Sequence, residues 1–260
     1  MQELKPVLAG AHSFSIQKST EEVILLCHGF NGTPQSMESL GEKFAEFGYS
    51  IHAPRLAGHG TSPSDMKACT AQDWYHSLET AYLQLKNRYT NVYVIGQSMG
   101  GSLTIKLAGK FPDMDGIGLI NAALEAPCYD AIKEPTGYVK EGRPDIKNQA
   151  AKEIAYDQVP AAAVYELKKT MAEAAGMLEQ VSCPAAVFYS PEDHVVPAAC
   201  SQNIIAAISS SRKKLIPLPN SYHVASMDYD QDVIVQNAGL FFSYKTNNEF
   251  CQGRSVLPLS

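Results

Sequence analysis

The chain has 260 residues, of which 45 % are hydrophobic, and its formal net charge at pH 7 is -6. This length and apolar content predict one domain with a single large core, interrupted by an insertion. The acidic charge argues against a nucleic-acid partner, because no basic run is longer than Arg212-Lys213-Lys214. Residues 1–20 lack the pattern of a signal peptide, and no apolar run approaches the ~18 residues of a membrane span. A cytoplasmic location is therefore expected.

Six cysteines are scattered along the chain, with no Cys-x-x-Cys pair and no histidine at zinc spacing. Free thiols are expected rather than disulfides or a metal site. The cysteines are Cys27, Cys69, Cys128, Cys183, Cys200 and Cys251.

Strand and helix patterns alternate along the first half of the chain. The segment Glu22–Cys27 ends in a continuous apolar run, which is typical of a strand covered on both faces. From Pro34 to Phe47 the apolar residues recur three and four apart, which predicts an amphipathic helix that ends at Gly48. Further strands are expected at residues 49–53, 92–95 and 116–120, and further helices at residues 71–86 and 99–111. Because no hairpin signal interrupts this order, it predicts an α/β fold with a mostly parallel sheet and helices on both faces.

The alternation breaks between residues 122 and 176, a stretch with charged and Pro-interrupted segments. Helical pieces are expected at residues 148–156 and 161–175, with no strong strand. This stretch predicts a cap over the strand ends, inserted into a core made of residues 1–121 and 177–246. The alternative is a surface loop that touches no substrate.

The sheet pattern resumes after the insertion. Strands are expected at residues 185–189 and 214–218, and helices at residues 197–208 and 230–244. Residues 247–260 have little periodicity and are expected to form a disordered tail.

One turn stands out as a candidate for chemistry. Gly96-Gln97-Ser98-Met99-Gly100 follows a predicted strand, precedes a predicted helix and fits the Gly-x-Ser-x-Gly nucleophile elbow. The two glycines allow the strand and helix to approach closely, and the turn exposes the Ser98 hydroxyl at the end of the sheet. The pattern predicts a nucleophile, against the alternative of a flexible turn with an incidental serine.

A serine nucleophile needs a base, and the base needs a carboxylate partner. Of seven histidines, only His223 follows the last predicted strand, whose loop returns to the edge where Ser98 lies. Asp193 follows the penultimate strand and is the expected carboxylate. Its rivals are Glu192, Asp228 and Asp230. Ser98, Asp193 and His223 are thus predicted to form a catalytic triad, against the alternatives of a turn aspartate and a surface histidine.

The negative charge that develops on a substrate oxygen also needs donors. Two backbone N–H groups typically supply them, and the expected donors are Met99, directly after the nucleophile, and Phe30, in the loop after the first buried strand. His28, His59 and His194 are interpreted as structural residues.

Together these motifs make the chain resemble the α/β-hydrolase family, and more narrowly the bacterial monoacylglycerol lipases and small bacterial carboxylesterases. The likeness spans nearly the whole chain. Its segments are His28-Gly29-Phe30-Asn31-Gly32-Thr33-Pro34, Pro54-Arg55-Leu56-Ala57-Gly58-His59-Gly60, Asp73-Trp74, residues 96–101, Asp193-His194-Val195-Val196-Pro197 and Asn220-Ser221-Tyr222-His223.

The resemblance implies lipid degradation by hydrolysis of medium- or long-chain monoacylglycerols through an acyl-serine intermediate, under a small mobile cap and without a cofactor or metal. The substrate is then a small-molecule lipid ester, and the cap is the part expected to contact a membrane or micelle transiently. In that family a cap glutamate holds the glycerol end, and Glu153 matches its position; the alternative is a solvent-facing helix residue. The chain departs from the family pattern at Gln97, at Cys128 and its surroundings, and in the tail after Phe250.

Other functions use the same residues. Thioesterases, carbon-carbon bond hydrolases and perhydrolases share the triad, so the pattern alone leaves the substrate open. A general carboxylesterase of short to medium acyl chains is the main alternative. A binding protein that kept the fold without turnover is a hypothesis from another class, but such a protein has no physical need of an intact triad.

Overall fold

A seven-stranded sheet forms the centre of the molecule, in a computed structural model that describes residues 3–252, except for the side chains of residues 243–252. The strand order is β1-β3-β2-β4-β5-β8-β9, and only the edge strand β1 is antiparallel to its neighbour. The strands are β1 (Phe14–Ile16), β2 (Glu22–Cys27), β3 (Ser50–Ala53), β4 (Asn91–Gln97), β5 (Gly116–Ile120), β8 (Ala185–Tyr189) and β9 (Lys213–Pro217). The predicted α/β fold with a mostly parallel sheet is confirmed.

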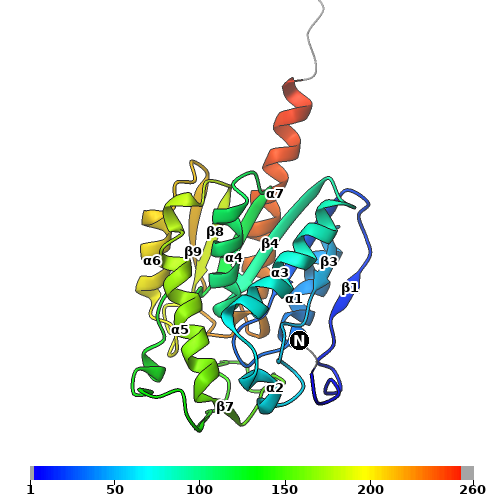
Figure 1. The fold of residues 1–260 in the computed structure, drawn as a ribbon. Coiled ribbons are helices and arrows are strands. Elements are labelled where there is room, and N and C mark those ends of the chain that lie inside the picture. Colours follow the sequence, from blue (N-terminus) through cyan, green and yellow to red (C-terminus); the bar gives the residue numbers. More distant parts are fainter. Residues whose placement is uncertain (1–2, 253–260) are drawn as a thin grey trace, which may run out of the picture.

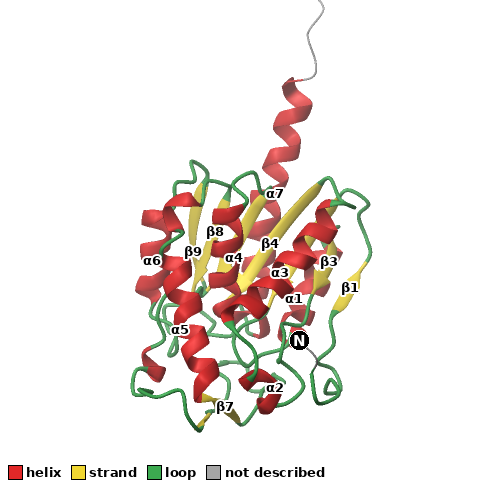
Figure 2. Cartoon of the chain, in the orientation of Figure 1, coloured by secondary structure: helices red, strands yellow, loops and turns green. Residues whose placement is uncertain are grey.

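Helices cover both faces of this sheet (Figures 1 and 2). They are α1 (Glu38–Glu46), α2 (Pro63–Lys67), α3 (Ala71–Lys86), α4 (Met99–Lys110), α5 (Ala161–Ala175), α6 (Ala198–Ala207) and α7 (Gln231–Gln252). Apolar residues of α1 and α7 form one core cluster with the sheet, whereas those of α3, α4, α5 and α6 belong to the cluster on the opposite face.

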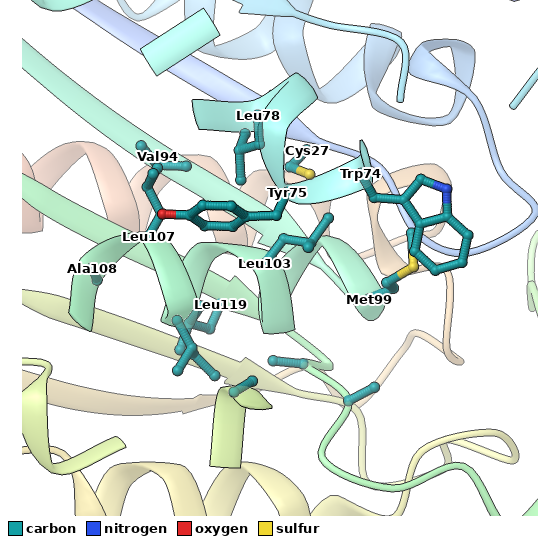
Figure 3. Close-up of a cluster of buried hydrophobic side chains, with 14 of the residues drawn as sticks. Cys27, Trp74, Tyr75, Leu78, Val94, Met99, Leu103, Leu107, Ala108 and Leu119 are labelled. Atoms are coloured by element: carbon teal, nitrogen blue, oxygen red, sulfur yellow. The ribbon is translucent and has the colours of Figure 1, made fainter. Parts of the chain in front are cut away.

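The strands explain why there are two core layers. In β2, Val23 and Leu25 belong to one cluster while Ile24 and Leu26 belong to the other, because successive strand side chains point to opposite faces. Both faces are therefore apolar, as expected for a parallel sheet between helices. Figure 3 shows side chains of one layer, among them Trp74 of α3 and Met99 of α4.

The insertion, residues 122–176, joins β5 to β8 and differs from its prediction in two places. Residues 148–156 are not helical but irregular, with a turn at residues 149–150, and β6 (Tyr138–Lys140) pairs with β7 (Gln158–Pro160) in a small antiparallel sheet. The physical reason is that core side chains bond the main chain near residue 153, as described below. The second half, α5, packs against α4 on the face of the sheet, and β7 lies beyond the carboxyl ends of the strands (Figure 1).

The C-terminal helix also departs from the prediction. α7 continues to Gln252, so residues 247–252 are helical rather than part of a tail. Figure 1 shows this helix projecting from the end of the molecule opposite β7. The remainder of the predicted tail, residues 253–260, lies outside the described residues.

Two small elements escaped the sequence patterns. β1 and α2 are three and five residues long, too short to show a hydrophobic period. Within residues 3–252, no helix combines the length and the apolar character that crossing a bilayer requires.

Candidate active site

Ser98 lies on the tight turn between β4 and α4. Its backbone has φ 56° and ψ -121°, a strained conformation for a residue with a side chain. A Cβ atom at Gly96 would strike the main-chain carbonyl of Gly100, and one at Gly100 would strike the carbonyl of Cys27. The turn therefore depends on both glycines.

The three predicted triad residues meet at the carboxyl ends of β4, β8 and β9. His223 Nε2 is 2.9 Å from Ser98 Oγ, and His223 Nδ1 is 2.8 Å from Asp193 Oδ2. The imidazole and the carboxylate are buried, with 9 % and 2 % of their side chains exposed. This geometry allows a proton to pass from the hydroxyl to the imidazole, and it fixes the ring orientation that such a transfer needs.

Asp193 is held in place by its other oxygen. Asp193 Oδ1 accepts hydrogen bonds from the N–H groups of Val195 and Val196, both at 2.8 Å. The rival carboxylates have other partners. Asp228 accepts the Tyr222 N–H at 2.9 Å, and Asp230 accepts the Ser221 hydroxyl at 2.9 Å. Glu192 lies 3.2 Å from the Lys147 ammonium.

Two amide side chains hold the loop that carries His223, and the sequence patterns gave neither of them a role. Asn121, directly after β5, donates through Nδ2 to the His223 carbonyl at 2.9 Å and accepts the Ser190 N–H at 2.7 Å. Gln97 Oε1 accepts the Ser226 N–H at 2.9 Å. The signal for Asn121 was present in the chain, because asparagine at a strand end tolerates the positive φ of 44° found there.

Two main-chain donors near Ser98 have no partner in the part of the chain that the structure describes. Within the described residues, the N–H groups of Phe30 and Met99 donate to no protein acceptor. Phe30 lines the same cavity as Ser98, and Met99 opens the helix that follows it. Unpartnered N–H groups in this position have the character of an oxyanion hole.

A cavity of about 270 Å³ opens at Ser98 and His223. Its apolar side includes Phe30, Tyr129 and Leu167, and the Tyr129 hydroxyl donates to Glu141 Oε1 at 2.9 Å. Burial raises the pKa of Glu141. Cys128, whose thiol is free, also lines this cavity.

Glu153 lies on the polar side of the same cavity. Its Oε1 is close to Gly32, where a Cβ atom would be only 2.6 Å away, so the glycine makes room for the carboxylate. Burial raises the pKa of Glu153 to about 7, against the opposing effect of nearby His223. The residue is partly exposed as a whole, and its carboxyl group lies against Gly32.

Two amide side chains of the core form hydrogen bonds with the backbone around Glu153. Gln35 donates to the Lys152 carbonyl at 3.0 Å and accepts the Ile154 N–H at 3.0 Å. Asn31 likewise donates to the Tyr156 carbonyl and accepts the Tyr156 N–H, both at 3.0 Å. These bonds use main-chain groups that a helix would need for itself, which explains why the predicted helix is absent.

The remaining histidines of the predicted motifs lie away from Ser98 Oγ. His28 is buried between the Gly29 carbonyl at 2.9 Å and the Leu56 N–H at 3.2 Å, and burial lowers its pKa. Burial lowers the pKa of His59 to about 4. His194 contacts Asp145 at 2.8 Å. Among the described side chains, no group of three or more His, Cys, Asp or Glu has the arrangement of a metal site.

A serine hydrolase of the α/β-hydrolase fold is the class of protein that this sheet and this site define. The chain belongs to the family described as serine aminopeptidase S33, whose model matches residues 18–230.

Relatives of this chain include lipolytic enzymes. It is 43 % identical over 247 residues to the thermostable monoacylglycerol lipase of Bacillus sp. (strain H-257), covering 94 % of this chain and 98 % of the relative. It is 26 % identical to a carboxylesterase of Bacillus subtilis over 85 % of this chain and 92 % of the relative. A solved structure of one of the metagenome-derived lipolytic enzymes LipS and LipT has a TM-score of 0.87 and 40 % identity, covering 92 % of this chain and 100 % of the other.

Proposed function

We propose that this protein is a monoacylglycerol lipase, which cleaves its substrates to glycerol and fatty acid through an acyl-serine intermediate. The observation that carries the reaction type is the continuous path from Ser98 Oγ through His223 to Asp193, with contacts of 2.9 and 2.8 Å. The choice of ester is supported by the 43 % identity to a relative named as a monoacylglycerol lipase.

In the first half of the reaction, Ser98 Oγ attacks the ester carbonyl carbon while His223 Nε2 accepts the hydroxyl proton. Asp193 stabilises the imidazolium that forms. The N–H groups of Phe30 and Met99 bind the negative carbonyl oxygen of the tetrahedral intermediate. When this intermediate collapses, His223 returns the proton to the leaving glycerol oxygen, and the acyl group remains on Ser98.

In the second half, water replaces glycerol. His223 removes a proton from the water as it attacks the acyl carbon, and then gives that proton to Ser98 Oγ as the fatty acid leaves. No cofactor or metal is needed for these steps.

Substrate orientation follows from the two sides of the cavity. The acyl chain lies against Phe30, Tyr129 and Leu167, and Glu153 accepts hydrogen bonds from the glycerol hydroxyls. In this arrangement residues 1–121 and 177–246 form the hydrolase core, and residues 122–176 form a cap that meets lipid surfaces transiently. We also propose a cytoplasmic location for the protein.

A substrate panel tests this proposal. Hydrolysis rates are compared for monoacylglycerols, p-nitrophenyl esters, acyl thioesters and an aminoacyl amide, with Ser98→Ala as the control. We expect monoacylglycerols of medium or long chain to give the highest kcat/KM. A preference for very short acyl groups with monoacylglycerol ignored would favour a general carboxylesterase, and a preference for thioesters would favour a thioesterase. Unreactive Ser98 in folded protein would favour a binding protein.

A further inference from the structure

Asp145 is a partly buried carboxylate beside the triad, and the mechanism above does not use it. It lies in the irregular segment between β6 and β7 and lines the cavity that holds Ser98 and His223. Its side chain is only 17 % exposed. A carboxylate that is largely shielded from water needs hydrogen-bond partners in the protein, and these partners show what it does there.

The partners of Asp145 are the two loops that carry the triad. Its Oδ2 accepts the N–H groups of His194 and His223, both at 3.1 Å, and its Oδ1 is 2.8 Å from His194 Nδ1. Its main-chain carbonyl accepts the Val224 N–H at 3.0 Å. One residue of the insertion therefore joins the loop after β8 to the loop after β9.

Each polar group of His223 has one partner. The ring nitrogens contact Asp193 and Ser98, the carbonyl accepts from Asn121, and the N–H donates to Asp145. Three of these partners belong to the core. Only the partner of the N–H comes from the insertion, so the position of the insertion acts directly on the backbone of the histidine.

We propose that Asp145 is a positioning residue, which fastens the insertion to His223 and couples the placement of the insertion to the reactivity of Ser98. The coupling rests on the proposed function, because it requires His223 to act as the base. When the segment around Asp145 moves away, the N–H of His223 loses its acceptor and the imidazole is no longer held against Ser98 Oγ. The active arrangement is then complete only with this segment in place.

The test compares Asp145→Ala with Asp145→Asn. Alanine removes every side-chain acceptor, whereas the asparagine oxygen can still accept both N–H groups. We expect Asp145→Ala to lower kcat for a short p-nitrophenyl ester and the rate of Ser98 labelling by a fluorophosphonate by about 10- to 100-fold, with KM little changed. Asp145→Asn should stay within about threefold of wild type, since it loses mainly the charge. Hydrogen exchange at the His223 amide, followed by mass spectrometry, should become faster in Asp145→Ala alone.

Lys147→Ala is the matched control. The Lys147 ammonium also ties the insertion to these loops, through Glu192 at 3.2 Å and the ring of Tyr222, but contacts no atom of His223. It is partly exposed, so this variant should stay within about twofold of wild type.

Two results would overturn the proposal: folded Asp145→Ala with wild-type labelling and exchange, or equal losses in Asp145→Ala and Lys147→Ala. Wild-type protein that neither hydrolyses esters nor labels at Ser98 would instead refute the proposed function. Faster amide exchange in Asp145→Ala would still reveal the tie to His223 in that case.

Discussion

The core and the insertion both line the cavity, but they hold their functional groups in different ways. Ser98, Asp193 and His223 follow the ends of β4, β8 and β9, so the register of a parallel sheet sets where their loops begin. Glu153 lies on irregular backbone that belongs to neither a helix nor a strand, and the side chains of Gln35 and Asn31 hold this backbone in place.

Because of this difference, the groups proposed to carry out the reaction and the group proposed to select the ester are held by different kinds of structure. A buried parallel ladder resists displacement, which suits groups that must exchange a proton over 2.9 Å. Hydrogen bonds from a few side chains to the main chain can be broken and remade at a lower cost in free energy. We therefore expect changes at the triad and its turn to abolish chemistry or folding, and changes at Glu153 to alter which ester is cleaved.

The largest effect is expected in the core. Ser98→Ala removes the nucleophile and should lower kcat for any ester by about 10⁴-fold or more, because the rest of the triad has nothing to activate. Ester binding should remain, and it can be followed through the fluorescence of Trp74, the single tryptophan, whose ring lies 5.8 Å from that of Phe30. A retained burst of alcohol release would contradict the role of Ser98, and an equal loss in Glu153→Ala would break the contrast between the two regions.

Glycine substitutions compare the packing of the two regions. Gly96→Ala places a Cβ atom against the Gly100 carbonyl and should lower the free energy of unfolding by about 3 kcal/mol. Gly176→Ala, at the end of α5, meets only carbonyl oxygens 3.6 and 3.7 Å away and should change it by less than about 0.5 kcal/mol. Urea unfolding of both variants measures this difference. Similar values for the two would show that the elbow has more room than its contacts indicate.

The same contrast decides what could be predicted from the sequence. The strands of the sheet can be predicted from local apolar runs. The ends of three of these strands then bring Ser98, Asp193 and His223 together. Residues 148–156 carry no such information, because their irregular conformation depends on hydrogen bonds from Gln35 and Asn31 more than a hundred residues away. Asp145 escaped the sequence analysis for the same reason, since its partners lie on distant loops.

A smaller effect is expected at the polar side of the cavity. Glu153→Ala should raise KM for a monoacylglycerol by roughly tenfold, because the glycerol hydroxyls lose a charged or strongly polar acceptor. The p-nitrophenyl ester of the same fatty acid has no glycerol and serves as the internal control, with little expected change. If both substrates lose equally, Glu153 supports the shape of the site rather than its choice of alcohol.

The smallest effect is expected on the free energy of unfolding, which should depend on pH through Glu153. Burial raises the pKa of Glu153 to about 7 from an ordinary value of 4.5, so between these pH values the folded protein binds a proton that the unfolded chain has released. Stability from this group is therefore present below pH 4.5 and is lost as the pH rises through about 7, because folding then buries a charge.

Glu153→Gln has nearly the same shape and no charge, so its free energy of unfolding relative to wild type should increase between pH 4.5 and about 7. Urea unfolding at several pH values measures this difference, with Glu134→Gln, at an exposed position of the insertion, as the control. A difference independent of pH would contradict the raised pKa of Glu153. The same pH dependence in Glu134→Gln would show that it does not come from the environment of Glu153.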